Sequence, residues 1–415
     1  MRRPTTRQTI ISTLVAAMFF ALAWFWDDLA REWRAGGVAL VALVGALTLL
    51  TRRPRPQAFA PPNALVGVLE QVLSDETRRP WNPTTLPWVP TGGTKPVLLV
   101  PAADYHLAEI FPLARELQGG GVETRIAIGE SPWGRTWQAL HWYPDLEMHV
   151  LPTPAEVARD ISAVVTMKDT GSMTDWVTEV RDHDIPVIGK VEGAQDFWDA
   201  DTPDARKPYR NLDLVLCQGR FDADALTGRD TAIVGSTRLE RLWWAPPVVP
   251  RQPLAVINLN FVYGVNTTDR DLWLDTAIEG CEAAGIPYVV SVHPAERTRL
   301  KTDRVTRIAA ARLLPHATVL ISRFSTLPFE AMARGVPFVY HNPHGETVKT
   351  FAEPMGAFEI TLDAAGLRGA VQGNSEPGHA NRARAETFFT NLVDIDRNQR
   401  SETRGAEAVK NVHGT

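Results

Sequence analysis

The sequence predicts an α/β protein with two doubly wound domains behind an N-terminal membrane hairpin. Three observations support this prediction. Short apolar runs alternate with helix-length segments from residue 96 to residue 340. A proline-rich break at 245–250 divides the alternation into two series, and two uncharged apolar runs precede residue 51. Alternation of this kind is typical of parallel sheets with helices on both faces.

The membrane hairpin is predicted for residues 1–56, with spans at about 9–26 and 35–50. At 1.5 Å per residue the two runs would give roughly 27 Å and about 24 Å of helix. Arginines flank the outer ends of both runs, and acidic residues outnumber basic ones in the turn. The positive-inside rule then places both ends in the cytoplasm, so the folded body is expected on the cytoplasmic side of the inner (cytoplasmic) membrane. A cleaved signal peptide is the alternative, but no small-residue cleavage site follows the first run.

Proline-rich residues 57–93 are predicted to form a linker or a collar at the membrane surface. Two Rossmann-like domains are expected next, at 94–250 and 251–396, facing each other across a cleft. A helix from about residue 378 to residue 392 should pack back on the body. The polar end, residues 397–415, is predicted to be disordered.

Composition excludes several classes of protein. The chain has 415 residues, 22% charged and 44% hydrophobic, which is close to globular averages. A formal net charge of -5 does not indicate a basic surface for nucleic-acid binding. Cys217 and Cys281 are the two cysteines, far apart in apolar segments, which indicates a reducing compartment without disulfides. No Cys/His spacing suits zinc, and no metal or other cofactor is expected.

His293 directly follows Tyr288–Val292, an apolar segment predicted to be a central strand that Pro294 terminates. Open parallel sheets bind ligands at the carboxyl ends of their strands, so this imidazole is expected at a binding crevice. It could donate to a phosphate oxygen or exchange a proton near neutral pH. A histidine that bonds only its own loop is the alternative.

Ser325 and Thr326 lie between a predicted strand, Val319–Ser322, and a predicted helix, Leu327–Arg334, with Gly335 suited to the position after the helix. Unpaired backbone N–H groups and the helix dipole favour an anion at such a helix start. The sequence therefore predicts a diphosphate-binding turn. Plain capping of the helix would use the same hydroxyls and is compatible with it.

Two charged residues flank this turn. Glu330 lies about one turn into the helix, from which its carboxylate could hold the ribose hydroxyls of a nucleotide. Arg323 could neutralise phosphate charge through a bidentate contact. The alternative for both is an ordinary solvated surface position.

These fragments together resemble the donor-binding half of GT-B glycosyltransferases. They are His293-Pro294, Ser325-Thr326 and the segment from Phe329 to Tyr340. Within that superfamily the chain is most similar to the CDP-glycerol glycerophosphotransferase family of teichoic-acid and capsule polymerases. Members carry a His-Pro after a strand and a Ser-Ser pair before a helix with Glu. The resemblance covers roughly residues 163–340.

The resemblance implies roles for individual residues. His293 would contact the donor diphosphate, Ser325 and Thr326 would bind phosphate oxygens, and Glu330 would hold the ribose. The family also places an Asp before its Ser pair, whereas Arg323 and Phe324 stand there in this sequence.

A second departure concerns the acceptor half. The family has a His-Gly after an N-terminal strand, and this His is its presumed base. Here the matching strand, Pro186–Lys190, is followed by Val191-Glu192-Gly193. Glu192 could replace the histidine as general base, because a carboxylate in a partly desolvated cleft can take a proton from an alcohol. A different acceptor or a different chemistry would also explain the change.

Two further segments could line the acceptor side or serve only as turns. Asp104, Tyr105 and His106 follow the first strand of the first domain. Gly235-Ser236-Thr237-Arg238 follows its last strand and resembles a glycine-containing turn of the family.

The sequence thus predicts a membrane-anchored, inverting GT-B transferase. It would move a glycerol-phosphate or glycosyl unit from a nucleotide-diphosphate donor to a lipid-linked or polymer acceptor in cell-envelope polysaccharide or teichoic-acid-like synthesis. One alternative is a nucleotide-sugar 2-epimerase of the same fold, although its Gly-Thr-Arg-Pro-Glu loop is absent where Val100–Asp104 stands. Another is a non-catalytic scaffold with a nucleotide fold, which the glutamate at position 192 supports.

Overall fold

The computed structural model describes the chain from residue 85 to residue 413 with gaps. The described residues are 85–90, 92–93, 95–102, 104–128, 148–167, 169, 173–193, 209, 211–261, 267–293, 296, 300, 302–374 and 382–413. All of them except Leu300 belong to one compact unit of the chain. The predicted hairpin at 1–56 lies outside these residues. Within the described ranges, no helix combines the length and the apolarity needed to cross a membrane.

The first sheet contains eight strands in the order β1-β4-β3-β2-β5-β6-β7-β8, and all the described pairings are parallel. Strands β2, β5 and β6 are buried along their whole length, as expected for a parallel sheet covered on both faces. The strands are β1 Thr85–Leu86, β2 Val97–Val100, β3 Thr124–Ile128, β4 Met148–Val150, β5 Ala163–Thr166, β6 Val187–Lys190, β7 Leu214–Cys217 and β8 Thr231–Ile233.

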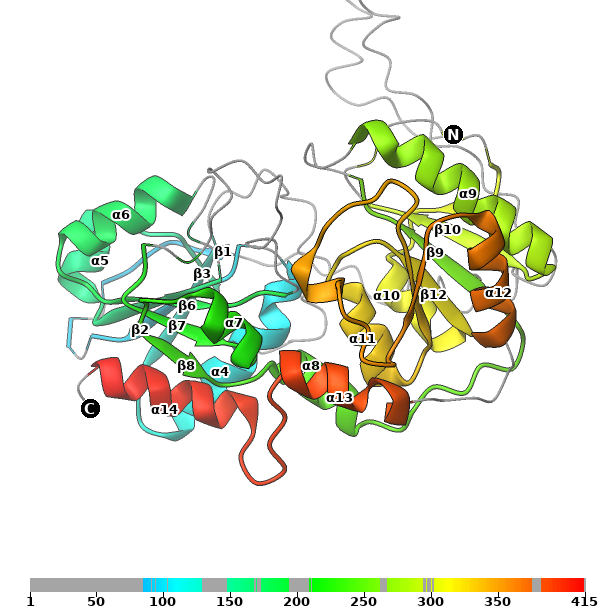
Figure 1. The fold of residues 1–415 in the computed structure, drawn as a ribbon. Coiled ribbons are helices and arrows are strands. Elements are labelled where there is room, and N and C mark those ends of the chain that lie inside the picture. Colours follow the sequence, from blue (N-terminus) through cyan, green and yellow to red (C-terminus); the bar gives the residue numbers. More distant parts are fainter. Residues whose placement is uncertain are drawn as a thin grey trace, which may run out of the picture. The chain divides into compact units, whose positions relative to one another are not determined.

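Helices cover both faces of this sheet (Figure 1). Helix α4 packs its apolar residues on one face, and α5 and α6 pack on the other. The elements that connect the strands are the 3-10 turn η1 Asp104–His106, α4 Leu107–Gly119, α5 Pro154–Asp160, α6 Thr174–Asp182, α7 Arg220–Ala225 and, after β8, α8 Thr237–Trp244.

The second sheet contains six parallel strands in the order β11-β10-β9-β12-β13-β14. Helices α9 and α12 lie side by side (Figure 1), while α10 and α11 contribute to the core on the other face. The elements are β9 Ala255–Leu259, η5 Thr267–Asp269, α9 Arg270–Ala284, β10 Tyr288–Val292, β11 Val305–Thr306, α10 Ala310–Leu313, η6 Leu314–His316, β12 Val319–Ser322, α11 Leu327–Arg334, β13 Phe338–His341, η7 Lys349–Phe351, β14 Glu359–Thr361 and α12 Ala364–Asn374.

Both sheets are doubly wound about a central pair of strands. In the second sheet the chain runs outward from β9 through β10 to β11, then returns to β12 and runs outward the other way. The first sheet repeats this pattern about β2 and β5. Ligands of such sheets bind beyond the carboxyl ends of the strands where the winding direction reverses. The two candidate positions are therefore the carboxyl ends of β2 and β5 and those of β9 and β12.

Helix α11 has the local signals that the sequence predicts for its ends. Pro328 lies in its first turn, and Gly335 adopts a φ of 77° at its C-cap, a left-handed conformation that glycine adopts without strain. Helix α13 Arg382–Leu392 packs against α11, so the predicted helix at about 378–392 is confirmed. Its Phe389 stacks on Trp243 of α8 with ring centroids 4.6 Å apart.

The prediction of a disordered end at 397–415 is wrong for most of that segment. Residues Ser401–His413 form α14, which lies beside α4 (Figure 1). Ala406 and Val409 are buried in the core of the first sheet, and Glu240 accepts a hydrogen bond of 2.8 Å from the N–H of Ser401 at the helix start. The few apolar residues of a polar segment share one helical face here, which average composition does not reveal.

The predicted linker also needs correction at its end. Thr85–Leu86 forms strand β1 and pairs in parallel with β4, so the first sheet begins before the predicted boundary at residue 94. Residues 57–84 lie outside the described ranges.

Candidate functional site

The candidate site of the first sheet contains a histidine and a carboxylate from two different strand ends. His106 follows β2 and Glu192 follows β6, and Nε2 of His106 lies 2.6 Å from Oε2 of Glu192. The histidine is 1% exposed, whereas the Glu192 side chain is 40% exposed. The carboxylate is therefore the member of the pair that a ligand can reach.

Hydrogen bonds fix the tautomer of His106. The backbone N–H of Ala102 donates to Nδ1 at 3.0 Å, so Nδ1 carries no proton. The ring proton then lies on Nε2 and is donated to Glu192. In this arrangement Glu192 is the hydrogen-bond acceptor and His106 holds it in place, because the ring has no other proton to give.

Two tyrosines also contact Glu192. The backbone N–H of Glu192 donates to the hydroxyl of Tyr209 at 3.0 Å, and the hydroxyl of Tyr105 donates to Oε2 of Glu192 at 3.5 Å. The Tyr105 ring meets the His106 ring edge to face, with centroids 4.5 Å apart, and remains 49% exposed. Tyr105 thus presents an aromatic face beside the carboxylate.

A histidine from elsewhere in the chain lies beside the position after β6. Glu192 occupies that strand end, and His106 reaches it from the turn after β2. The sequence places His106 among the candidates for the acceptor side, but no local signal links it to Glu192. The strand order, in which only β5 separates β2 from β6, brings them together.

The segment Gly235–Arg238 forms the start of α8, where Glu109 of α4 serves as a second cap. The Glu109 carboxylate accepts hydrogen bonds from the N–H groups of Thr237, at 2.9 Å, and Arg238, at 3.2 Å, and lies 3.3 Å from Nζ of buried Lys190. Burial raises the pKa of Glu109, but Lys190, Arg238 and the hydrogen bonds from the Ser236 hydroxyl and the Arg238 N–H outweigh it, so the pKa is lowered. This ionised network ties α4, β6 and α8 together.

The candidate site of the second sheet lies at the carboxyl ends of β9 and β12. Oγ of Ser325 accepts hydrogen bonds from the N–H of Leu327 at 3.1 Å and from Nδ2 of Asn258 at 3.5 Å. Asn258 also donates to Oγ of Ser322 at 3.0 Å. Thr326 occupies the N-cap position of α11 without a capping bond from its side chain. Ser325 is thus the residue whose side chain bonds the first turn of the helix.

This turn is in close contact with the turn that carries Glu192. A Cβ atom added at Gly193 would lie 2.0 Å from Oγ1 of Thr326, so only glycine fits there without displacing Thr326. The chain thereby brings together two of the predicted site segments, Glu192–Gly193 and Ser325–Thr326.

His293 lies where the sequence predicts it, directly after β10, and is half-buried. Its backbone N–H donates to the carbonyl of Leu259 at 3.3 Å. Burial lowers the pKa of His293 below its usual 6.5, and nearby Glu296 opposes the shift without cancelling it. The imidazole is therefore neutral at pH 7, and its predicted contact with a diphosphate stays a prediction.

Glu330 pairs with a cation of this chain. Its Oε1 lies 3.2 Å from Nη1 of Arg238, and both side chains are largely buried. The proposed ribose contact of Glu330 stays a prediction, and a ribose would have to share the carboxylate with Arg238.

Arg323 is 2% exposed, so the surface position that the sequence allows for it is wrong, and its contact with a phosphate stays a prediction. Nε of Arg323 donates to Oε2 of Glu346 at 2.8 Å, and its guanidinium stacks on Phe261 at 4.5 Å. Burial raises the pKa of Glu346, but His344, Arg323 and Tyr340 lower it to about 2. The physical reason is that a buried guanidinium needs a carboxylate partner, so this arrangement favours a structural role for Arg323.

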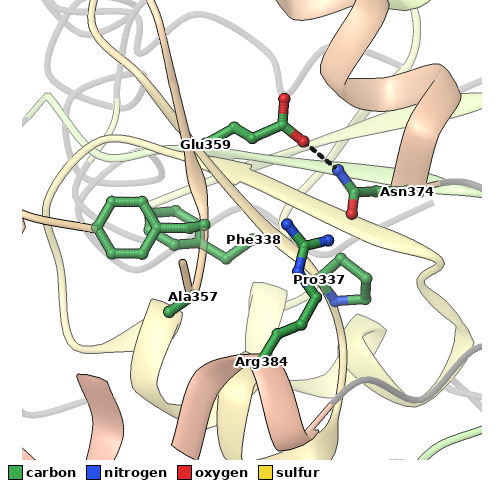
Figure 2. A pocket seen from close by; sticks show the side chains of 7 residues that line it. Pro337, Phe338, Ala357, Glu359, Asn374 and Arg384 are labelled. Carbon is green, nitrogen blue, oxygen red and sulfur yellow. Dashed lines mark hydrogen bonds between the residues drawn. The ribbon is translucent and has the colours of Figure 1, made fainter. Parts of the chain in front are cut away.

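A shallow hollow elsewhere on the second sheet contains none of these residues. It lies at the amino ends of β13 and β14, where Nδ2 of Asn374 donates to Oε1 of Glu359 at 2.9 Å (Figure 2). Its lining also includes Pro337, Phe338, Ala357 and Arg384. Parallel sheets bind their ligands at the opposite, carboxyl end.

Within the described parts of the chain, no group of three or more His, Cys, Asp or Glu side chains is arranged to hold a metal ion.

No protein-family model and no curated protein matches the chain. Its likeness to the CDP-glycerol glycerophosphotransferase family therefore stays a prediction. Solved structures do resemble it. S. aureus MnaA with UDP has a TM-score of 0.53 at 10% identity and covers 77% of this chain and 96% of its own.

Two other solved structures are comparably similar. UDP-GlcNAc 2-epimerase from Methanocaldococcus jannaschii, in complex with UDP-GlcNAc and UDP, has a TM-score of 0.51 at 14% identity and covers 77% of this chain and 100% of its own. Arabidopsis thaliana UGT89C1 complexed with UDP has a TM-score of 0.50 at 10% identity, with 78% and 100% covered. At these identities the likeness establishes the fold, which is a two-domain α/β fold of the GT-B type.

Proposed function

We propose that this chain is a GT-B transferase that moves a glycosyl or glycerol-phosphate unit from a nucleotide-diphosphate donor to an acceptor hydroxyl. One observation carries the proposal: the turn with the reachable carboxylate of Glu192 contacts the anion-favouring turn at Ser325–Thr326. A group transfer to an alcohol needs these two functions side by side. One removes the proton of the attacking hydroxyl, and the other stabilises the leaving phosphate.

The donor would bind at the carboxyl ends of β9 and β12. The N-terminus of α11 supplies the positive end of a helix dipole for a diphosphate, and the hydroxyls of Ser325 and Thr326 lie at the same place. His293, neutral at pH 7, would donate a further hydrogen bond. The solved neighbours with UDP bound support a nucleoside diphosphate as the ligand class.

The acceptor would bind beside Glu192. Its hydroxyl gives its proton to the carboxylate as its oxygen attacks the donor. With a nucleotide sugar the oxygen bonds to the anomeric carbon, the glycosidic C–O bond breaks and the nucleoside diphosphate leaves. With CDP-glycerol the oxygen bonds to the distal phosphorus and CMP leaves. His106 keeps the carboxylate oriented towards the acceptor hydroxyl during the reaction, because its Nε2–H donates a hydrogen bond to Glu192.

A 2-epimerase is the second candidate, since one of the similar structures, with a TM-score of 0.51, is a UDP-GlcNAc 2-epimerase. Another, S. aureus MnaA with a TM-score of 0.53, has UDP bound. An epimerase rearranges one nucleotide sugar and needs no acceptor. The same carboxylate could then remove the proton from the sugar carbon. The two candidates differ in their requirement for a second substrate.

We further propose that the acceptor is lipid-linked or a polymer of the cell envelope and that the protein acts at the inner face of the cytoplasmic membrane. This proposal rests on the apolar runs at 9–26 and 35–50 and their flanking arginines. Membrane fractionation of the tagged full-length protein, with a version lacking residues 1–56 as the comparison, tests it. Equal recovery of both proteins in the soluble fraction would contradict it.

The function is tested with the full-length protein in detergent. Thermal stability is measured with UDP, CMP, UDP-GlcNAc and CDP-glycerol, because a bound ligand raises the apparent melting temperature by mass action. Ligands that stabilise the protein are then offered with and without membrane extract, and nucleotide release is followed. Release that depends on the extract supports a transferase, and interconversion of UDP-GlcNAc without extract supports an epimerase. A protein that no nucleotide stabilises would rule out both.

A further inference from the structure

Three polar side chains form a small network at the point where the winding of the second sheet reverses. Asn258 lies within β9, a strand whose other residues are buried, and is itself half-buried. Its Nδ2 donates to Oγ of Ser322 at 3.0 Å and to Oγ of Ser325 at 3.5 Å. Ser322 is fully buried at the end of β12, whereas Ser325 is half-buried in the turn that follows. The network therefore connects the sheet interior to the accessible turn.

The hydrogen bonds of Ser325 determine what its hydroxyl can still do. A serine hydroxyl has two lone pairs and one proton. Oγ of Ser325 accepts from Asn258 and from the N–H of Leu327, which lies 3.1 Å away. Both lone pairs are then in use, and the proton remains for a donated bond. Ser325 can act only as a donor towards a ligand.

We propose that Asn258 is a positioning residue that makes Ser325 a dedicated hydrogen-bond donor for an anionic oxygen, such as a non-bridging diphosphate oxygen. This inference deepens the proposed function and rests on it for the identity of the natural ligand. Without the Asn258 amide, one lone pair of Ser325 is free and the hydroxyl proton can turn towards the protein.

The network also specifies the class of ligand. An oxyanion accepts a hydrogen bond from the Ser325 hydroxyl and is attracted by the start of α11, which adds the positive end of a helix dipole. An ammonium or amide group on the ligand would find no lone pair on Ser325. The turn therefore selects phosphate-like groups over groups that donate hydrogen bonds.

A double-mutant cycle in the full-length protein tests the proposal, with inorganic pyrophosphate and UDP as probes. The variants are Asn258→Ala, Ser325→Ala and the double variant. We expect each single change to weaken pyrophosphate binding about tenfold, the size of effect of a lost charge-assisted hydrogen bond. The double variant should also be weakened about tenfold, because Asn258 acts through Ser325. Losses that multiply to about a hundredfold would overturn the proposal, as would unchanged binding in Asn258→Ala.

Asn374→Ala is the matched control, since this amide also bonds a side chain of the same sheet but lies at the opposite end of the strands (Figure 2). It should bind both probes like the unchanged protein. Asn258→Asp gives an independent measurement if Asn258→Ala is unstable. A carboxylate accepts hydrogen bonds, so it would draw the Ser325 proton inward and weaken pyrophosphate binding at least as much. Binding by Asn258→Asp as tight as in the unchanged protein would overturn the proposal.

The two probes separate this inference from the proposed function. Coupled losses for pyrophosphate without any UDP binding would support the role of Asn258 and contradict the nucleotide-dependent function. If UDP binds and the losses from Asn258→Ala and Ser325→Ala multiply in the double variant, the nucleotide-dependent function is supported and the role of Asn258 is contradicted. Binding of neither probe would overturn both.

Discussion

The two sheets share a doubly wound strand order, but the chemistry at their carboxyl ends differs. The first sheet brings a histidine and a carboxylate into contact, His106 and Glu192. The second presents an amide, hydroxyls and the start of a helix, at Asn258, Ser325 and α11. A carboxylate oriented by a histidine can take a proton from a ligand, whereas fixed dipoles suit anion binding. The same topology thus presents different chemistry in its two halves, and under the proposed function one half would transfer a proton and the other would bind an anion.

The charged residues at the two candidate sites also differ in exposure. Glu192 is reachable from solvent, whereas Arg323, in the loop after β12, is buried and paired with Glu346. A buried, satisfied ion pair rigidifies its surroundings and stays ionised over a wide pH range. We therefore infer that reactivity depends on the carboxylate of the first half and that the geometry of the turn depends on the ion pair of the second.

The largest effect is expected from Glu192→Gln, which keeps the shape of the side chain but removes its capacity to take a proton. Turnover should fall at least about a hundredfold, the usual contribution of a general base. The dissociation constant of UDP, measured by calorimetry, should stay within about twofold, because Glu192 belongs to the other half. Glu179→Gln, an exposed carboxylate on α6, is the control. Unchanged turnover in Glu192→Gln would show that the two halves do not divide the work in this way.

The ion pair of the second half gives the next largest effect. Glu346→Gln leaves the Arg323 guanidinium buried without a counter-charge, which should lower the free energy of unfolding by about 3 kcal/mol. Urea denaturation measures the change, with exposed Glu353→Gln as the control. Equal stability of Glu346→Gln and the unchanged protein would contradict a structural role for the pair.

The pH dependence of stability provides a second measurement of the same pair. The pKa of Glu346 is lowered from 4.5 to about 2 in the folded chain, so its stabilisation is complete above about pH 4.5 and is lost as the pH falls towards 2. Glu346→Gln should lose this part of the acid dependence. If the free energy of unfolding of the variant depends on acid pH in the same way as that of the unchanged protein, the Glu346 carboxylate is not paired with Arg323 as in the structure.

Elements that depend on local burial were predictable from the sequence. The strands Tyr288–Val292 and Val319–Ser322 and the helix Leu327–Arg334 have the predicted bounds. A strand buried on both faces of a parallel sheet requires a continuous apolar run, and Gly335 marks the end of the helix after it. The position of the turn at Ser325–Thr326 follows from the same signals, because a strand and a helix must meet there.

Contacts between distant segments were not predictable. His106 and Glu192 are 86 residues apart, and only the strand order brings them together. The partner of Arg323 comes from the loop after β13, 23 residues later, so the sequence alone suggests an exposed cation. Helix α14 is polar on average, and its buried face is recognisable only once α4 is in place against it.

Replacement of His106 tests whether the first half works as a pair. His106→Ala removes the donor that holds Glu192 and should lower kcat about tenfold, a loss near the size expected for one hydrogen bond to a charged group. His106→Gln can place an amide N–H near the position of Nε2 and should restore part of the rate. The KM for the donor should not change in either variant. No difference in kcat between Ala and Gln at this position would indicate a packing role only.

The smallest effect is expected from His293, the imidazole of the anion-binding half. Because burial lowers its pKa below 6.5, the ring is neutral at pH 7.5, and His293→Ala should weaken UDP binding only about fivefold, the value of one neutral hydrogen bond. As the pH falls towards the lowered pKa of His293, the ring takes up a proton and attracts the diphosphate more strongly. The ratio of affinities between the unchanged protein and the variant should therefore grow as the pH is lowered from 7.5 through this pKa, whereas exposed His183→Ala should show no such trend. A ratio that does not depend on pH would remove His293 from the diphosphate site and leave anion binding to the helix start and its hydroxyls.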